Sequence, residues 1–175
     1  MYKLSKKPLI TAKQIEQRLD ALAGEIKPFD FDVILSALTG SYIFTADLSR
    51  RLAKPNLQIK FIRASSYGDS TESCGNVQVS GLEGFDIRGK RVLVIDDILD
   101  TGATMACLTR ILSGMGASLI KICVLLDKEG RRTTDISADF VGFNIKNEFV
   151  VGYGLDCAGE YRTLPEIWTL GEQNG

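Results

Sequence analysis

The chain has 175 residues, of which 45% are hydrophobic and 25% charged, a composition typical of one globular domain with a buried core. Its formal net charge of −1 excludes a general attraction to nucleic acid or to anionic membranes, so we expect a small-molecule partner, no nucleic acid and no membrane. No apolar run approaches the roughly twenty residues of a membrane span, and the N-terminal segment lacks the apolar core of a secretion signal. We therefore expect a cytoplasmic protein.

The use of cysteine and histidine excludes further classes. The four cysteines contain no Cys-x-x-Cys pair, and the sequence has no histidine. A Cys/His zinc site and a Ser/His or Cys/His catalytic unit are therefore excluded. Cys107 and Cys123 fall in apolar periodic segments, which predicts small core residues in a reducing compartment.

Apolar periodicity predicts strands and helices that alternate along the chain. A capping box at 11–14 opens the first helix. Its apolar stripe consists of Ile15, Leu19, Leu22 and Ile26. Strands are expected at 32–38, 57–64, 77–82, 92–95, 119–126, 140–143 and 149–153, and further helices at 41–53 and from about 102. This order predicts an α/β fold with a central, mainly parallel sheet flanked by helices. No internal repeat or long linker divides residues 1–175, so we expect a single domain.

The stretch 92–104 is the most informative part of the sequence. A four-residue apolar run, typical of a strand covered on both faces, leads directly into Asp96 and Asp97 and then into a Thr-Gly-Ala-Thr turn at 101–104. The backbone amides of a helix that begins near Gly102 favour a bound phosphate, and the glycine lets the backbone approach it closely. The two carboxylates would repel a phosphate, so we expect them to face ribose hydroxyls or a magnesium ion.

This stretch resembles the phosphoribosyl-diphosphate (PRPP) motif of the type I phosphoribosyltransferases. In that family two acidic residues hold the ribose hydroxyls, and the following loop holds the 5′-phosphate. The residues that the resemblance assigns to PRPP are Asp96, Asp97, Asp100, Thr101, Gly102, Ala103 and Thr104. A buried strand whose exit carries an acidic helix cap is the alternative, but it does not explain three carboxylates within five residues.

Asp100 points to the substrate class. Related transferases for adenine, orotate or uracil usually have a small residue here, whereas enzymes for 6-oxopurines have Asp. A 6-oxopurine attacks the sugar through N9 while it loses a proton at N7, and a positioned carboxylate can accept that proton. Asp100 is therefore the candidate catalytic base. It can also cap the following helix, and the two roles are compatible.

Two other loops resemble parts of the same family. The loop Leu38-Thr39-Gly40 matches the one that grips pyrophosphate, often through a non-proline cis peptide between the first two positions. Many hypoxanthine-guanine enzymes have Lys where this chain has Thr39, so that charge contact is missing. Ser66 and Tyr67 match the flexible loop, which predicts a mobile lid over about 66–76 that excludes water. An ordinary strand-to-helix turn and a solvated hairpin loop are the respective alternatives.

A second block, about 127–164, resembles the purine-binding half of the hypoxanthine-guanine phosphoribosyltransferases. The resemblance assigns Lys128 to the purine 6-oxo group, Phe149 to stacking on the base, Val150 to backbone hydrogen bonds, Asp156 to magnesium and Arg162 to pyrophosphate. Judged without the family, Phe149 is a core residue and Lys128 a surface residue.

The resemblance as a whole implies a type I phosphoribosyltransferase fold, with a small hood formed by the N- and C-terminal segments. It implies magnesium-dependent transfer of phosphoribose from PRPP to N9 of hypoxanthine or guanine in purine salvage, with Asp96, Asp97 and Asp156 on the metal. It also implies a homo-dimer or homo-tetramer. The alternative is a PRPP-sensing regulator that binds RNA or DNA, but such a protein needs a basic patch and has no use for Asp100.

Overall fold

The computed structural model describes residues 2–65, 72–74, 77–128 and 130–172. Its strands are β1 (Tyr2–Leu4), β2 (Val33–Leu38), β3 (Gln58–Ser65), β4 (Glu72–Cys74), β5 (Val77–Ser80), β6 (Arg91–Leu99), β7 (Leu119–Lys128), β8 (Phe140–Ile145), β9 (Val150–Val151) and β10 (Trp168–Glu172). Its α-helices are α1 (Ala12–Ile26), α2 (Tyr42–Leu52) and α3 (Ala103–Gly114), and a short 3₁₀ helix (Lys27–Phe29) follows α1.

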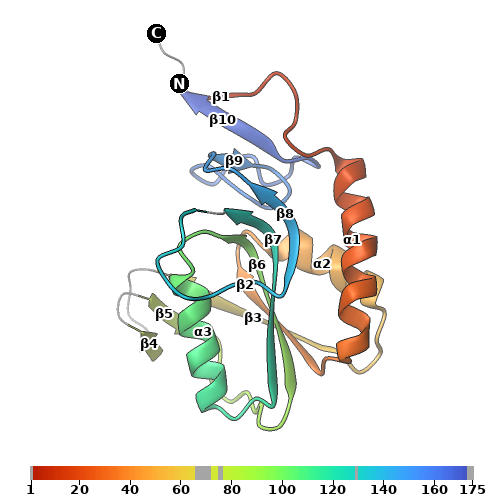
Figure 1. Ribbon diagram of the computed structural model, residues 1–175, viewed down its shortest axis with the longest axis vertical. Helices are drawn as coiled ribbons and strands as arrows, with labels where there is room; N and C mark the ends of the chain where they lie inside the picture. Colours follow the sequence, from red (N-terminus) through yellow and green to blue (C-terminus); the bar gives the residue numbers. More distant parts are fainter. Residues whose placement is uncertain (1, 66–71, 75–76, 129, 173–175) are drawn as a thin grey trace.

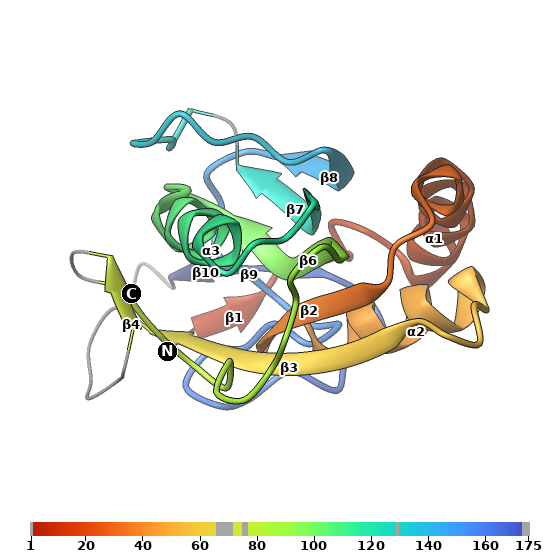
Figure 2. The same ribbon diagram turned by 90° about the horizontal axis from the view of Figure 1, so that it is seen from below.

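The large sheet has the strand order β4-β5-β3-β2-β6-β7-β8. Strands β3, β2, β6, β7 and β8 run parallel, and the antiparallel strands β5 and β4 extend the edge beside β3. Helices α1 and α2 cover one face and α3 covers the other (Figure 2). The α/β fold with a mainly parallel sheet, as the sequence predicts, is confirmed.

The core follows from the apolar pattern of the strands and helices. In β6, Leu93 and Ile95 pack under α1 and α2, whereas Val92 and Val94 pack under α3, and all four side chains are fully buried. Burial on both faces explains why this strand reads as a continuous apolar run. The predicted stripe of α1 is buried, and the helix begins with the predicted capping box at Thr11.

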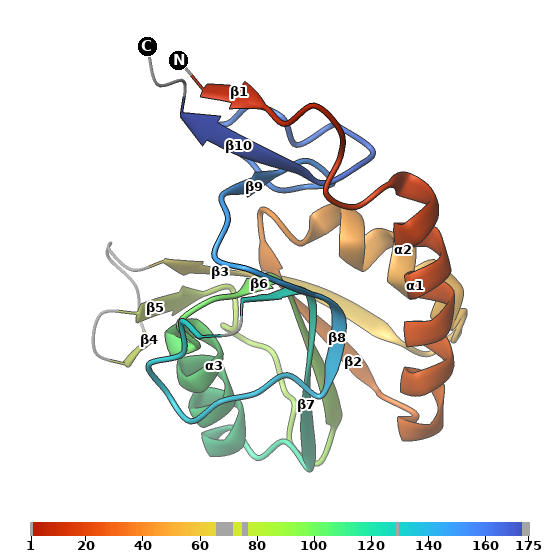
Figure 3. The same ribbon diagram turned by 45° about the horizontal axis from the view of Figure 1, so that its top comes forward.

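A second, three-stranded sheet with the order β1-β10-β9 forms the hood, which lies beyond one end of the large sheet (Figure 1, Figure 3). Strand β1 pairs with β10 in antiparallel register, with Tyr2 opposite Glu172, and β10 pairs with β9. The predicted hood built from N- and C-terminal segments is therefore confirmed. Among the residues that the structure describes, no helix is long and apolar enough to cross a membrane.

Some elements differ from those that the sequence predicts. Strand β6 continues to Leu99 and includes both aspartates of the predicted turn. The strand predicted at 149–153 is reduced to β9, because Gly152 and Tyr153 have positive φ angles of 97° and 51° and turn the chain away. Strands β1, β4 and β10 were missed. Each is short, and its pairing partner is not visible in the local pattern.

Candidate active site

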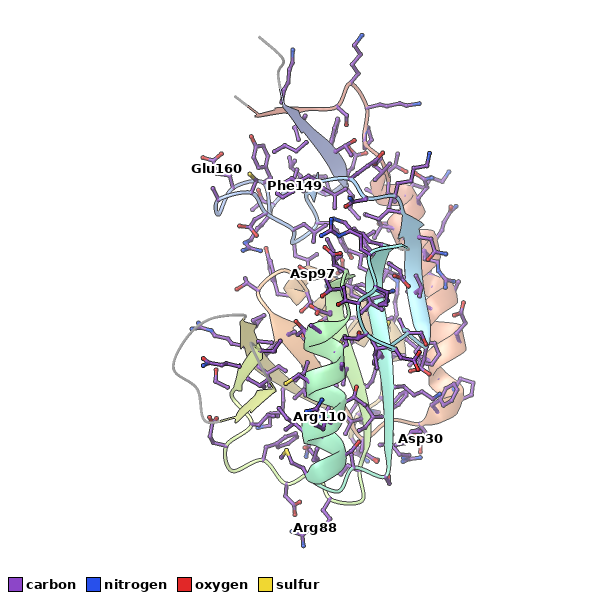
Figure 4. The ribbon with its side chains drawn as sticks, turned by 60° about the vertical axis from the view of Figure 1, so that its left-hand side comes forward. Asp30, Arg88, Asp97, Arg110, Phe149 and Glu160 are labelled. Carbon is purple, nitrogen blue, oxygen red and sulfur yellow. The ribbon has the colours of Figure 1, made fainter. Side chains whose placement is uncertain are left out.

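The candidate site lies between the carboxyl end of the large sheet and the hood. Asp97, near the end of β6, lies at that end of the sheet, and Phe149, just before β9, lies above it (Figure 4). Asp30 and Arg88 lie at the opposite end of the sheet (Figure 4). The position agrees with the rule that ligands bind outside the carboxyl ends of parallel strands.

The acid pair of β6 is electrostatically strained. Asp96 accepts a hydrogen bond from the Asp97 backbone amide at 2.9 Å, and Asp97 accepts one from the Ile98 amide at 2.7 Å. Desolvation, followed by the charge of Asp97, raises the pKa of the Asp96 carboxyl well above its usual range, and desolvation also raises the pKa of Asp97. A pair of this kind is stabilised by hydroxyl donors or by a cation.

The loop 38–41 approaches this acid pair without an intervening side chain. The peptide bond between Leu38 and Thr39 is cis, as the resemblance predicts. A Cβ atom on Gly40 would lie 1.5 Å from Oδ2 of Asp97, so no larger residue fits while that carboxylate keeps its place. The glycine therefore brings the backbone of the loop directly against the acid pair.

The turn 101–104 forms the start of α3. Gly102 is the N-cap residue with a φ of 86°, and the helix begins at Ala103, as predicted. A Cβ atom on Gly102 would lie 2.3 Å from Oγ1 of Thr134, because the segment after β7 packs on the turn. The Thr133 amide also donates to the Thr101 carbonyl at 3.0 Å. The turn is thus fixed on its outer side, and its amides form a helix N-terminus suited to an anion.

Asp100 has a partner that sequence reasoning missed. Nε of Arg131 lies 2.7 Å from Oδ1 of Asp100, and Nη1 of the same arginine donates to Asn147 at 3.3 Å. The two side chains of the ion pair are 38% and 44% exposed, so solvent screens their attraction. No local sequence pattern predicts this contact, because thirty residues of chain and a whole strand separate its partners.

Lys128 and Phe149, the candidate purine-binding side chains, have the opposite burial from that expected of each residue type alone. Lys128, at the end of β7, is only 9% exposed, whereas Phe149 is 52% exposed. The interpretation of Phe149 as a core residue and of Lys128 as a surface residue is therefore wrong. Val150 is buried in β9, where it pairs with β10. An exposed aromatic ring can stack on a flat base, and a largely buried lysine can donate a hydrogen bond to a carbonyl oxygen.

Arg162 and Asp156 form an ion pair within the segment that joins β9 to β10. Nη2 of Arg162 lies 2.8 Å from Oδ1 of Asp156, and Nη1 donates to the Gly154 carbonyl at 2.7 Å. The charge of Arg162 partly offsets the desolvation that raises the pKa of Asp97. A cation at this position can meet an anionic leaving group.

The three predicted magnesium ligands are not gathered into one cluster. Among the residues that the structure describes, no three His, Cys, Asp or Glu side chains are grouped to hold a metal ion by themselves. Both oxygens of Asp156 have partners, Arg162 and the Gly159 amide. The oxygen donors of Asp96 and Asp97 still suit magnesium, which keeps several waters and is usually bound by one or two carboxylates together with substrate phosphates. Ser66 and Tyr67, the predicted lid residues, lie outside the described residues.

Comparison with known proteins agrees with this geometry. The family model described as the phosphoribosyl transferase domain matches residues 9–158. A protein named hypoxanthine-guanine phosphoribosyltransferase from Aquifex aeolicus is 41% identical over 169 residues, which cover 94% of each chain. One of the same name from Bacillus subtilis is 39% identical and covers 94% of this chain and 92% of its own.

The fold gives the same result. A crystal structure of a hypoxanthine-guanine phosphoribosyltransferase from Bacillus anthracis superimposes with a TM-score of 0.87 at 37% identity, over 98% of this chain and all of that chain. The matched fold and the PRPP motif together define a phosphoribosyltransferase. The chain belongs to the phosphoribosyltransferase family, and within it to the hypoxanthine-guanine phosphoribosyltransferases.

Proposed function

We propose that this chain transfers phosphoribose from PRPP to N9 of hypoxanthine or guanine, and thereby forms IMP or GMP and pyrophosphate in purine salvage. The observation that carries the proposal is the acid pair, Asp96 and Asp97, which lies at the carboxyl end of the sheet just before the turn 101–104, with Phe149 above it (Figure 4). Relatives that share more than a third of their residues over nearly the whole chain bear the corresponding enzyme name. No observation favours the nucleic-acid-binding alternative.

The donor is held along the carboxyl end of the sheet. The amides of Thr101 to Thr104 receive the 5′-phosphate, and the carboxylates of Asp96 and Asp97 accept hydrogen bonds from the ribose hydroxyls. The backbone of loop 38–40 and the guanidinium of Arg162 hold the pyrophosphate. The positive charge of Arg162 opposes the negative charge that develops on the leaving group.

The acceptor base lies between the donor and the hood. Phe149 stacks on the purine, Lys128 donates to its 6-oxo group, and the backbone of Val150 hydrogen-bonds its edge. As the bond from N9 to C1′ forms and the bond from C1′ to pyrophosphate breaks, the N7 proton passes to the carboxylate of Asp100. That carboxylate becomes available when Arg131 turns away, which costs little because the ion pair is half-exposed.

Magnesium fits the oxygen donors of this site. We propose that Asp96 and Asp97 would hold it together with PRPP, and that Asp156 would contribute a third carboxylate only by giving up its ion pair with Arg162. When bound, the metal neutralises charge on the pyrophosphate and so supports its departure.

The experiment that tests the proposal is a product analysis. Purified protein is incubated with PRPP and magnesium and with hypoxanthine, guanine, xanthine or adenine in separate reactions, and products are identified by mass spectrometry. We expect IMP or GMP together with stoichiometric pyrophosphate, and no AMP. Absence of a nucleotide from every purine would refute the proposal, and a PRPP-dependent mobility shift of RNA or DNA would support the regulatory alternative.

We further propose that the chain acts in the cytoplasm as a single catalytic domain and as a homo-dimer or homo-tetramer. Ile59 and Phe61, which share one face of β3, are large apolar side chains that remain exposed in the monomer. Sedimentation velocity tests the assembly, and a purely monomeric species at micromolar concentration would refute it.

A further inference from the structure

A phenol–carboxylate hydrogen bond joins the hood to helix α2. The hydroxyl group of Tyr153, two residues after β9 ends, donates to Oδ2 of Asp47 at 2.6 Å. Burial, followed by the hydrogen bond to Asp47, raises the pKa of the Tyr153 phenol, which is therefore a hydrogen-bond donor at alkaline as well as neutral pH. The other carboxylate oxygen of Asp47 contacts Arg50 of the same helix. The acceptor is therefore held in place from both sides.

On the hood side, Tyr153 lies in a turn that rests on the loop 38–41. Gly152, Tyr153 and Gly154 all have positive φ angles, which a side-chain-bearing residue such as Tyr153 rarely adopts. A Cβ atom on Gly154 would lie 2.2 Å from the carbonyl oxygen of Gly40, so the two backbones touch directly. The turn 152–154, which follows the purine-side residues Phe149 and Val150 in the chain, is thus in direct contact with the pyrophosphate loop.

On the other side, α2 is tied to the same loop by buried hydroxyl groups. The Oγ atom of Ser36 lies 2.8 Å from Oγ of Ser41 and 2.8 Å from Oγ1 of Thr45, and the Ser41 hydroxyl also donates to the Ala37 carbonyl. All three hydroxyl-bearing residues are buried. A shift of α2 would therefore carry the loop with it.

The hood turn also packs against the helices. Tyr153, which is 6% exposed, belongs to the same buried apolar cluster as Ile15 of α1 and Leu48 of α2, and Ile43 of α2 packs against that cluster. A pocket of about 320 Å³ opens beside this contact and is bordered by Tyr153 and Asp47. The hydrogen bond between Tyr153 and Asp47 adds a directional contact that apolar packing alone does not supply.

We infer that Tyr153 and Asp47 are positioning residues, which hold the purine-binding segment at 149–150 in register with the loop 38–41 that receives pyrophosphate. The inference rests on the proposed function, since it concerns the relative placement of acceptor and donor. Neither residue touches the substrates in this scheme. Their effect is on how often the two bound substrates are aligned for reaction, a quantity on which rates depend steeply.

The test compares Tyr153→Phe with the native enzyme at 25 °C. The variant keeps the ring and loses only the donor, so we expect kcat for IMP formation to fall about tenfold, while KM for PRPP stays within about twofold because the donor-binding residues are unchanged. Tyr42→Phe removes an exposed phenol from the same helix and serves as the matched control, with native kcat expected. A merely structural role would lower the melting temperature and leave kcat unchanged, and that result would overturn the inference.

Substitution of the acceptor gives an independent test. Asp47→Asn retains an acceptor oxygen and should keep most of the native kcat, whereas Asp47→Ala should reproduce the loss seen in Tyr153→Phe. The double variant should be no slower than Asp47→Ala, because both changes remove one interaction. Multiplicative losses, or equal kcat values for the alanine and asparagine variants, would refute the inference. Failure of the native enzyme to form IMP would instead refute the proposed function.

Discussion

At the scale of single residues, the proposed chemistry depends on the carboxylate of Asp100. We expect Asp100→Asn to preserve folding and PRPP binding and to lower kcat about 100-fold, because an amide cannot accept the N7 proton and general-base catalysis contributes about 10²–10⁴. Steady-state kinetics measure the change, and titration calorimetry checks donor binding. Asp135→Asn, an exposed change in the neighbouring segment, is the matched control. Native turnover in Asp100→Asn would refute the assignment of the base.

Gly40 has no space for a side chain, so we expect a substitution there to disturb the acid pair directly. Gly40→Ala would place a methyl group 1.5 Å from Oδ2 of Asp97 and force the carboxylate or the loop to move. We expect kcat/KM for PRPP to fall by about 100-fold or more, since displacements of about 1 Å at a reacting centre cost that much. Gly24→Ala, in the exposed interior of α1 with nothing near its Cβ position, should instead stabilise the fold by about 0.5–1 kcal/mol. Equal kcat/KM values for the two variants would contradict the proposed geometry.

At the scale of elements, an ion pair joins the starts of two neighbouring strands. Asp32, just before β2, accepts hydrogen bonds from the backbone amide of Arg91 at 2.8 Å and from its guanidinium at 2.9 Å, where β6 begins. The hydrogen bonds from Arg91 lower the pKa of Asp32 from 3.8 to about 2. Because the pKa is lower in the folded state, the stabilisation is complete above about pH 4 and is lost as the pH falls through about 2.

The corresponding prediction concerns stability against pH. We expect Asp32→Asn to lower the free energy of unfolding by about 1 kcal/mol at pH 7, a value reduced for partial solvent exposure, and the difference from the native protein to vanish near pH 2. Urea unfolding at several pH values measures both quantities. Asp20→Asn removes a more exposed partner, paired with Arg51, and should change stability little. A difference that does not depend on pH would contradict the role of the charge.

The elements also show what local sequence can predict. The strand that leads into Asp96, the helix start near Gly102 and the capping box at Thr11 are local signals. The structure has all three, although the strand continues beyond its predicted end at 95. Strand β10 and the contact from Arg131 to Asp100 depend on segments far apart in the chain, which periodicity does not report. Burial of Lys128 and exposure of Phe149 likewise depend on the tertiary structure. The family resemblance supplied those site residues, whereas single-residue statistics pointed the other way.

At the scale of the whole molecule, PRPP should bind the folded state and not the unfolded state, because its proposed contacts come from β2, β6 and α3 together. At about 100 times its dissociation constant, PRPP with magnesium should stabilise the protein by about 2.7 kcal/mol. For a domain of this size that raises the melting temperature by about 5–10 °C. Thermal denaturation followed by circular dichroism measures the shift. A chelator should remove most of it, and an equal shift without magnesium would refute the metal assignment.

The pairing of the first strand with the last has a consequence for how the protein is made. Strand β1 has no partner until the chain has been extended through β10, because the two strands lie at opposite ends of the described residues. A chain that ends before Trp168 therefore contains the acid pair and the turn 101–104, but it lacks the strand that pairs with β1 and β9 in the hood. The hood over the acid pair therefore forms only once β10 is available to pair with both β1 and β9.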